Sequence, residues 1–345
     1  MPIVIGHRGA CGYVPEHTLT SYFIAIQDGV DYVEPDLVMT QDAVLVARHE
    51  NEIGTTTNVA AHSEFAGRRT TKVIDGTAVT GWFTEDFTLA ELKTLRARER
   101  IPEIRPANTR FDGQFQIPTL EEILALVQAV EQQRATLAKQ LGRAAPAPVG
   151  VYPETKHPTY FQHAGLAMEE RLVSTLERYG YHGRHGRAFI QSFEVTNLKA
   201  LSKLTQLPLV QLLEATGAPY DFVAKGDART YADLIAPRGL DEMSKYAAAI
   251  GPSKSLVIPR TSRDSLGEPT SLVSDAHAQG LRVHAWTFRA ENSFLPQDFR
   301  AGAAPGAFGN LDGELHAYLK AGLDGFFTDH ADIGVRNRDA FLSSV

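Results

Sequence analysis

The chain has 345 residues, 43% hydrophobic and 22% charged, which is an ordinary globular balance for one large domain or two modest ones. Its formal net charge of −7 argues against general nucleic-acid binding, which needs a basic surface. No apolar run approaches the roughly 18 residues needed to cross a bilayer, so we expect no stable membrane insertion.

The first segment, residues 3–7, is predicted to be a strand that runs directly into His7. It follows no basic n-region, and its apolar stretch is too short for a signal peptide. We therefore expect a cytoplasmic protein if Met1 is the native start, or a protein from which a leader was removed. Cys11 is the single cysteine, so no internal disulfide can form, and we expect it to be a small packing residue.

Eight β-rich runs alternate with helical patterns along most of the chain. They are residues 3–7, 32–38, 150–155, 188–193, 209–213, 247–251, 282–288 and 324–328. Such alternation is typical of βα units and a parallel sheet. Eight units that close on themselves predict a (β/α)8 TIM barrel, built from residues 1–345 as one domain.

The barrel rhythm breaks after the second run. Residues 50–117 are rich in Gly, Thr and Arg and contain one short helical pattern near residues 89–95. We predict that they form an insertion after strand 2 that caps the barrel mouth. Residues 215–241 and 289–311 are expected to be long loops that frame the site.

Helix starts are marked by side chains that can cap them. Thr88 with Glu91, and Thr119 with Glu122, fit the capping-box pattern before apolar periodicity. We therefore expect helices to begin after Thr88 and after Thr119.

Three acids are expected to gather at the carboxyl ends of the strands. Glu34 and Asp36 are two residues apart in one predicted strand and so project to one face, and Glu154 ends the third run. Like charges side by side need neutralisation, and hard carboxylate oxygens suit one divalent cation, Ca²⁺ or Mg²⁺. The alternatives are ion pairs of Glu154 with Lys156 and of Arg8 with Asp36, or a zinc site that uses His7 and His49.

Two prolines lie beside these acids. Pro35 and Pro153 each fall inside a predicted barrel strand, where proline removes a ladder donor. We expect local irregularity there that aims the neighbouring carboxylates.

The same strand ends supply cations and imidazoles. Arg8 and Lys156 suit a phosphate ester, since arginine binds it in a fork and lysine as a point charge. His7 and His49 are the predicted general acid and base. Ten histidines are expected to be surface or structural residues: His17, His62, His157, His163, His182, His185, His277, His284, His316 and His330.

Taken in order, these motifs resemble the glycerophosphodiester phosphodiesterase family, and the opening is similar to its bacterial periplasmic branch. The matching segments are residues 6–10, 15–18, 34–40, 49, 152–156, 191–193, 284–287 and 325–329. The resemblance extends over nearly the whole chain. It departs at Glu50, where an aspartate is common, and at Trp286, where the periplasmic branch carries tyrosine.

The resemblance implies roles for the motif residues. It implies a metal on the three acids, catalysis by the two histidines, and phosphate contacts from Arg8 and Lys156. Phe193 and Trp286 would pack on the glycerol, while Glu16 and Gln191 would lie close behind the site.

The implied reaction hydrolyses small glycerophosphodiesters to sn-glycerol 3-phosphate and an alcohol, through a cyclic phosphate, and the branch implies a periplasmic location. One alternative is a phospholipase- or sphingomyelinase D-like barrel lyase, which needs a membrane-docking loop. The other is a non-catalytic binding protein on the same barrel.

Overall fold

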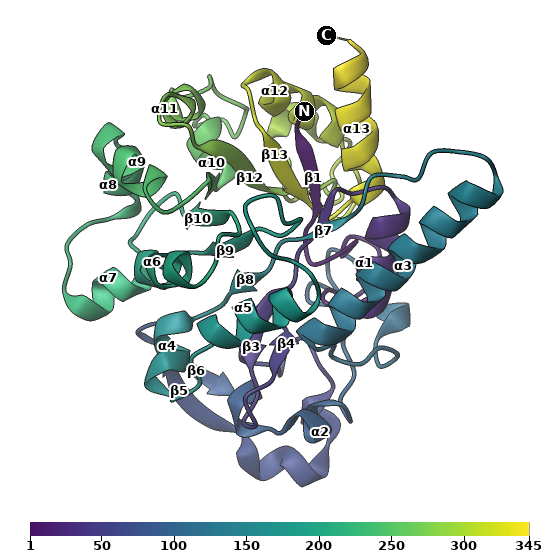
Figure 1. The fold of residues 1–345 in the computed structure, drawn as a ribbon, viewed down its shortest axis with the longest axis vertical. Helices are drawn as coiled ribbons and strands as arrows, with labels where there is room; N and C mark the ends of the chain where they lie inside the picture. Colours follow the sequence, from purple (N-terminus) through teal and green to yellow (C-terminus); the bar gives the residue numbers. More distant parts are fainter. Residues whose placement is uncertain (345) are drawn as a thin grey trace.

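A ring of parallel strands wrapped by helices forms the body of the computed structural model, which describes residues 1–344 (Figure 1). In ring order the strands are β1 (Ile3–Gly6), β2 (Tyr32–Val33) continued by β3 (Asp36–Met39), β7 (Gly150–Val151) continued by β8 (Glu154–Thr155), β9 (Ile190–Ser192), β10 (Leu209–Leu213), β11 (Ala249–Pro252), β12 (Arg282–Phe288) and β13 (Gly325–Thr328). The last strand pairs in parallel with β1, which closes the ring. The predicted (β/α)8 barrel is confirmed.

Strands 2 and 3 of the ring are each interrupted at a proline. Pro35 separates β2 from β3, and Pro153 separates β7 from β8. The ladder continues across the break, because the Glu154 backbone N–H donates to the Pro35 carbonyl at 3.0 Å. The interruptions place Glu34 and Glu154 beside irregular backbone, as the sequence suggested.

The barrel interior and the helix–sheet interface form separate apolar clusters. Along β1, Val4 packs in the large cluster between sheet and helices, whereas Ile5 joins a smaller one with Tyr152, Phe189 and Phe327. This follows from the two-residue repeat of a strand, which sends neighbours to opposite faces. The smaller cluster fills the barrel centre, so polar strand ends lie on a packed floor.

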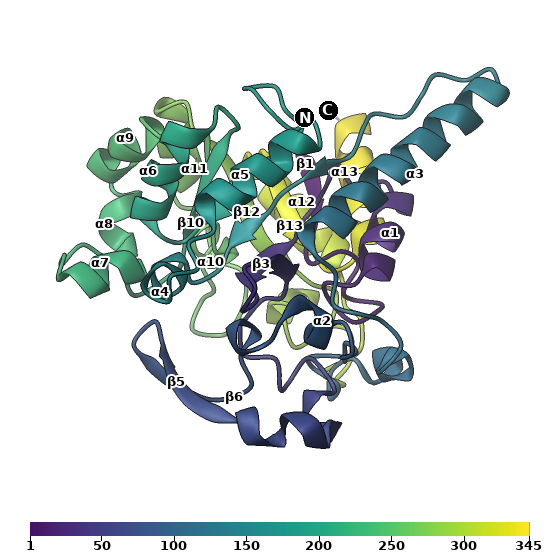
Figure 2. The same ribbon diagram turned by 60° about the horizontal axis from the view of Figure 1, so that its bottom comes forward.

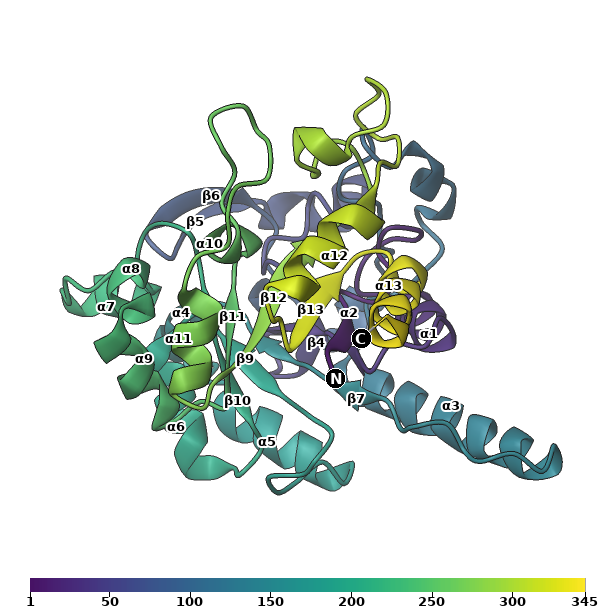
Figure 3. The same ribbon diagram turned by 90° about the horizontal axis from the view of Figure 1, so that it is seen from above.

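Helices surround the ring. Those outside residues 50–117 are α1 (Leu19–Gln27), α3 (Leu120–Gln140), α4 (Pro158–His163), α5 (Glu169–Arg178), α6 (Val195–Leu204), α7 (Tyr220–Lys225), α8 (Tyr231–Ile235), α9 (Pro237–Ser244), α10 (Lys254–Val257), α11 (Leu272–Ala278), α12 (Leu311–Lys320) and α13 (Ala331–Ser343). The C-terminal half of α3 extends away from the barrel (Figure 3). None of the helices within residues 1–344 combines the length and apolarity that a membrane span requires.

The predicted caps are present. Thr88 begins α2 (Leu89–Leu92) and Thr119 begins α3, each with a reciprocal capping box. Their side chains satisfy backbone donors that the first helical turn leaves free.

Residues 50–117 follow a hairpin in which β4 (Leu45–Ala47) pairs antiparallel with β3. They contain η1 (Val59–Ala61), η2 (Ser63–Arg68), β5 (Thr70–Ile74), β6 (Thr77–Gly81), η3 (Thr84–Asp86), α2 and η4 (Pro106–Phe111). The segment reaches the barrel rim through ion pairs, because Arg100 contacts Glu16 and Arg105 contacts Asp329. Figure 2 shows the β5–β6 hairpin curving beneath α4 and α7.

One expected loop is helical. Residues 215–241 carry α7, α8 and the start of α9, so the expectation of a long loop there was wrong. The sequence signals for these helices are short. Thr230 and Asp233 form a capping box, and Leu234 and Leu240 are buried apolar residues of α8 and α9. Helices of this length show too few turns for apolar periodicity to stand out. In contrast, residues 289–310 contain η5 (Gln297–Phe299) as their one helical element, and α12 begins at Leu311.

Candidate active site

His7 leaves the end of β1 and lies between two carboxylates. Its Nδ1 is 2.6 Å from Asp329 Oδ1, and its Nε2 is 3.8 Å from Glu34 Oε2. The acceptor at Asp329 assigns the ring proton to Nδ1 and leaves the lone pair at Nε2. Burial, reinforced by the Arg8 charge, lowers the pKa of His7 to about 4. The imidazole is therefore neutral near pH 7 and can accept a proton at Nε2.

Asp329, which follows β13, is held by cations on several sides. Arg105 Nη2 lies 2.5 Å and Arg289 Nε 2.9 Å from its Oδ2. These arginines hold the pKa of the Asp329 carboxyl well below its usual range, despite its burial. Asp329 is the last residue of the family motif at 325–329, but it was not predicted as a site residue. Its position beside His7 depends on closure of the barrel.

Glu34, Asp36 and Glu154 converge as the strand spacing predicted. One oxygen of each lies within 4.8 Å of the others, and all three side chains are buried. Burial and the neighbouring acids raise the pKa of Glu34 well above its usual range. Burial, with Asp36 nearby, raises the pKa of Glu154 to about 8. With all three acids ionised, the cluster would therefore carry more negative charge than its surroundings neutralise.

Asp36 is positioned by a buried histidine. His17 Nε2 lies 3.0 Å from Asp36 Oδ2, and His17 Nδ1 lies 2.7 Å from the Tyr22 hydroxyl. His17 was expected to be a surface or structural residue, and it is structural: fully buried and in contact with a proposed ligand. The other oxygen, Asp36 Oδ1, is buried without a hydrogen-bond partner.

The three acids fit a divalent cation. Both alternative ion pairs also exist, with Lys156 Nζ 2.8 Å from Glu154 Oε1 and Arg8 Nε 3.4 Å from Asp36 Oδ2. These two cations leave the pKa of Glu154 raised and Asp36 Oδ1 unpaired, so they do not complete the cluster. A hard cation with oxygen ligands would satisfy both features.

A zinc site on the two histidines finds no support in the described residues. His49 belongs to neither group of clustered ligand atoms within residues 1–344. The other such group joins His7, Cys11 and Asp329, but two arginines already bind that carboxylate. Cys11 itself is buried, as expected of a packing residue.

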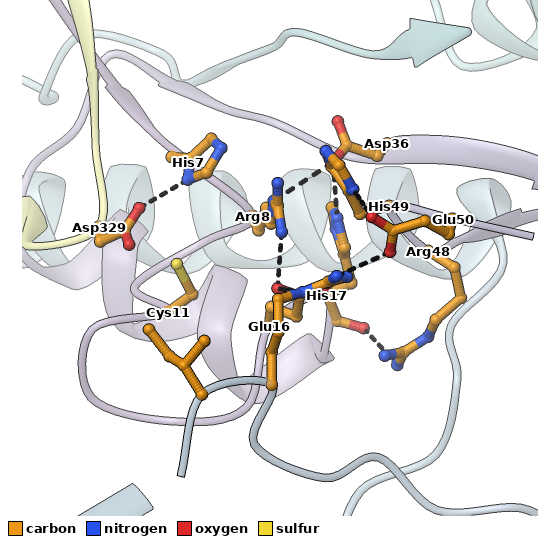
Figure 4. Close-up of polar contacts among 12 residues, drawn as sticks. His7, Arg8, Cys11, Glu16, His17, Asp36, Arg48, His49, Glu50 and Asp329 are labelled. Carbon is orange, nitrogen blue, oxygen red and sulfur yellow. Dashed lines mark hydrogen bonds and ion pairs between the residues drawn. The ribbon is translucent and has the colours of Figure 1, made fainter. Parts of the chain in front are cut away.

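His49 follows β4 and lines the same cavity as His7. Its Nδ1 contacts the Glu50 carboxylate, and its Nε2 lies 3.2 Å from Lys156 Nζ. Burial and the charges of Arg8 and Lys156 lower its pKa well below the usual range. In Figure 4, Arg8 is drawn between His7 and His49. Glu50, the longer acid at a position where aspartate is common, still reaches the imidazole.

One cavity of about 180 Å³ collects most of the predicted residues. Those that line it are His7, Arg8, Glu34, His49, Glu154, Lys156, Gln191, Phe193 and Trp286. Asp36 and Glu16 lie behind this wall, where Glu16 accepts a hydrogen bond of 2.8 Å from Arg8 Nη1. Gln191, in the wall itself, donates to Glu34 Oε1 at 2.7 Å. The site thus joins imidazoles, acids and cations on one surface.

Two aromatic side chains form the apolar side of this cavity. The rings of Phe193 and Trp286 meet edge to face with centroids 5.8 Å apart. Trp286 Nε1 donates to the Gly251 carbonyl at 2.7 Å, which fixes the indole. An apolar wall opposite charged groups suits a small ligand with carbon and phosphate parts.

The family model described as the glycerophosphoryl diester phosphodiesterase family matches residues 7–333. The chain belongs to this family. The resemblance of its motifs is confirmed, and with it the expectation of an enzyme rather than a binding protein.

Relatives match over most of their own length. A glycerophosphodiester phosphodiesterase of Arabidopsis thaliana is 35% identical, covering 95% of this chain and 83% of that protein. One from Haemophilus influenzae is 29% identical, covering 96% and 88% respectively.

Among solved structures, the Oleispira antarctica phosphodiesterase in complex with the product sn-glycerol-3-phosphate has a TM-score of 0.59 at 19% identity. That match covers 98% of this chain and 97% of the other, and it supports the barrel fold.

Proposed function

We propose that this family member hydrolyses glycerophosphodiesters to sn-glycerol 3-phosphate and an alcohol. The observation that carries this proposal is the shared cavity, where two imidazoles with depressed pKa values face a cluster of three buried acids. The Oleispira relative, whose structure holds sn-glycerol-3-phosphate as product, is consistent with this substrate class.

Glu34, Asp36 and Glu154 would hold one divalent cation, Ca²⁺ or Mg²⁺, because the group of ligand atoms that they form within residues 1–344 consists of hard carboxylate oxygens. When bound, such a cation stabilises charge on phosphate oxygens and makes a nearby hydroxyl easier to deprotonate.

Arg8 and Lys156 would contact the phosphate. Both are buried, and each is held by an acid, Arg8 by Glu16 at 2.8 Å and Lys156 by Glu154 at 2.8 Å. Because these contacts fix the side chains before substrate arrives, less conformational entropy is lost on binding. Phe193 and Trp286 would pack against the glycerol carbons, as the family resemblance implies.

In the first step, His7 Nε2 takes the proton of the glycerol hydroxyl next to the phosphate. The hydroxyl oxygen then bonds to phosphorus, and the bond from phosphorus to the head-group oxygen breaks. The bound phosphodiester anion offsets the charges of Arg8 and Lys156, which lower the pKa of His49 in the free protein, so that His49 takes up a proton and supplies it to the departing alcohol. Glu50 beside His49 Nδ1 stabilises the imidazolium required for that role.

In the second step the cyclic phosphate opens. His49, now neutral, takes a proton from water as the water oxygen bonds to phosphorus. The bond from phosphorus to the glycerol oxygen that attacked in the first step breaks, and His7 returns its proton to that oxygen. Attack by a neighbouring hydroxyl gains about 7–11 kcal/mol from proximity, beyond what two acid–base groups supply.

We further propose that residues 50–117 act as the cap of this site. Arg100 and Arg105 tie the segment to Glu16 and Asp329 at the barrel rim. A cap there would limit access of bulk water to the reacting groups.

Incubation with glycerophosphocholine and Ca²⁺, followed by ³¹P NMR, tests the reaction. We expect the diester signal to give way to glycerol 3-phosphate through a transient cyclic phosphate. A cyclic phosphate that persists as the end product would indicate the lyase alternative. Release of phosphocholine, or no turnover of any glycerophosphodiester, would contradict the proposal.

A further inference from the structure

A second cavity of about 390 Å³ lies beside the catalytic one. The two share four wall residues: Glu154, Lys156, Phe193 and Glu214. A diester bound at the acid cluster has two organic arms, and the smaller cavity with Trp286 is assigned to the glycerol arm. The larger cavity is therefore placed to receive the alcohol that leaves.

The outer wall of this cavity comes from the tip of the β5–β6 hairpin. Asp75 and Gly76 form the tip, both with positive φ, of 46° and 80°. Asp75 Oδ2 is 2.6 Å from His157 Nδ1, and a Cβ on Gly76 would lie 3.7 Å from the Tyr220 ring. The hairpin thus spans from the loop after β8 to α7.

Acids outnumber basic groups on the wall of this cavity, where Asp75, Glu154, Glu194 and Glu214 lie with Lys156 and His157. Asp75 Oδ1 is shielded from solvent yet has no hydrogen-bond partner. Glu194 and Glu214 form no ion pair with Lys or Arg within residues 1–344. Burial, with Asp221 and Asp75 nearby, raises the pKa of Glu194 to about 8. A ligand with positive charge would favour the ionised form of these carboxyls and be attracted to it.

Aromatic rings share the same wall. Phe193, Tyr220 and Tyr231 line the cavity, and the rings of Phe193 and Tyr231 meet edge to face at 6.4 Å. Lys156 Nζ already lies 5.7 Å from the centroid of the Phe193 ring. Tyr220 and Tyr231 therefore supply the aromatic faces that, beside carboxylates, would bind an alkylammonium group through cation–π attraction.

We propose that this cavity binds the head group of the substrate and selects alcohols that carry an ammonium group, with quaternary ammonium favoured by the aromatic wall. This inference rests on the proposed function, because it assigns the second arm of the same diester. A neutral head group, such as a second glycerol, would gain neither the cation–π contacts nor the attraction of Asp75.

The first test separates charge from shape by binding alone. Choline and its uncharged isostere 3,3-dimethylbutan-1-ol are titrated into the Ca²⁺-loaded protein by calorimetry. We expect choline to bind about tenfold more tightly than the isostere. Equal affinity, or binding of neither alcohol, would overturn the proposal.

The second test compares kcat/KM for glycerophosphocholine with that for glycerophosphoglycerol. We expect the wild type to prefer the choline diester, and Asp75→Asn and Tyr220→Leu each to reduce that preference about 3- to 30-fold. Two variants are used because the first alters a hairpin tip. Glu170→Gln, which removes an exposed acid from α5, is the matched control and should leave the preference unchanged.

The outcomes distinguish the two proposals. Turnover of both diesters at equal kcat/KM, or a choline preference that survives both variants, would overturn the head-group assignment and leave the proposed function standing. Turnover of neither diester would contradict the proposed function itself.

Discussion

Two clusters of buried charged residues flank His7, one around Asp329 and the other formed by Glu34, Asp36 and Glu154. The balance between acids and cations differs between them. At Asp329, one carboxylate meets His7, Arg105 and Arg289, and its pKa is held well below the usual range. At the other cluster three acids meet two cations, Glu154 has a pKa of about 8, and Asp36 Oδ1 has no partner. The first cluster is electrostatically complete and the second is not.

This difference indicates what each cluster does. Burying unpaired charge is costly, so a fold retains it where function requires it. The Asp329 cluster fixes the tautomer and direction of His7 without a ligand. The Glu34 cluster is arranged for a cation that the chain itself does not supply. Substitutions in each cluster and removal of the cation can separate these two roles.

Substitution of the two imidazoles should have the largest effect on turnover. His7→Ala and His49→Ala should each lower kcat by about 10²–10⁴-fold, because each removes one proton-transfer group. Both proteins should keep the far-UV circular dichroism and Ca²⁺ affinity of the wild type. Wild-type turnover by either variant would remove that histidine from the mechanism.

Removal of the bound cation should affect only the cluster of Glu34, Asp36 and Glu154. Dialysis against EDTA should lower activity by about 10³-fold or more, since a bound cation contributes several kcal/mol to the transition state. Added Ca²⁺ or Mg²⁺ should restore it, whereas Glu34→Gln should not respond to either ion. Full activity after complete chelation, verified by elemental analysis, would rule out the metal role.

Asp329→Asn should disturb the other cluster. We expect kcat to fall about 10–100-fold because the amide no longer enforces the Nδ1–H tautomer of His7, with Ca²⁺ affinity changed little. Asp324→Asn is a matched control, since Asp324 Oδ2 forms a similar bond of 2.7 Å to His277 away from the site. Equal effects of the two substitutions would show that the first acts through stability.

The pH dependence of cation binding gives a smaller, graded effect. Because the pKa of Glu154 is about 8 without metal, a cation must displace a proton below that pH. Ca²⁺ affinity should therefore rise with pH up to about 8 and then level off, and Glu154→Gln should flatten the curve. Calorimetry in buffers of different ionisation enthalpy should detect the released proton. An affinity that falls over this range would contradict the charge balance described here.

Local patterns in the sequence were enough for much of this architecture. The eight strand positions, the caps at Thr88 and Thr119, and the convergence of Glu34 with Asp36 all follow from short-range periodicity or hydrogen bonding. Even the breaks at Pro35 and Pro153 follow from a single missing donor.

What the sequence did not reveal depends on partners distant in the chain. Asp329 meets His7 only because β13 closes on β1, and Arg105 reaches Asp329 only through the fold of the inserted segment. His17 looked like any other polar residue before α1, since nothing local predicts its contact with Asp36. The proposed head-group cavity was not predicted from the sequence for the same reason. Its wall forms where the hairpin tip and α7 meet, and these segments are distant in the chain.

Arg100 shows how closely the inserted segment is joined to the chemistry. Its guanidinium contacts Glu16, which holds Arg8, and Glu50, which holds His49. A single side chain outside the barrel thereby sets the direction of one proposed phosphate ligand and one proposed proton donor. A design that places this active site on another eight-stranded barrel would therefore need the inserted segment, residues 50–117, as well as the residues at the strand ends.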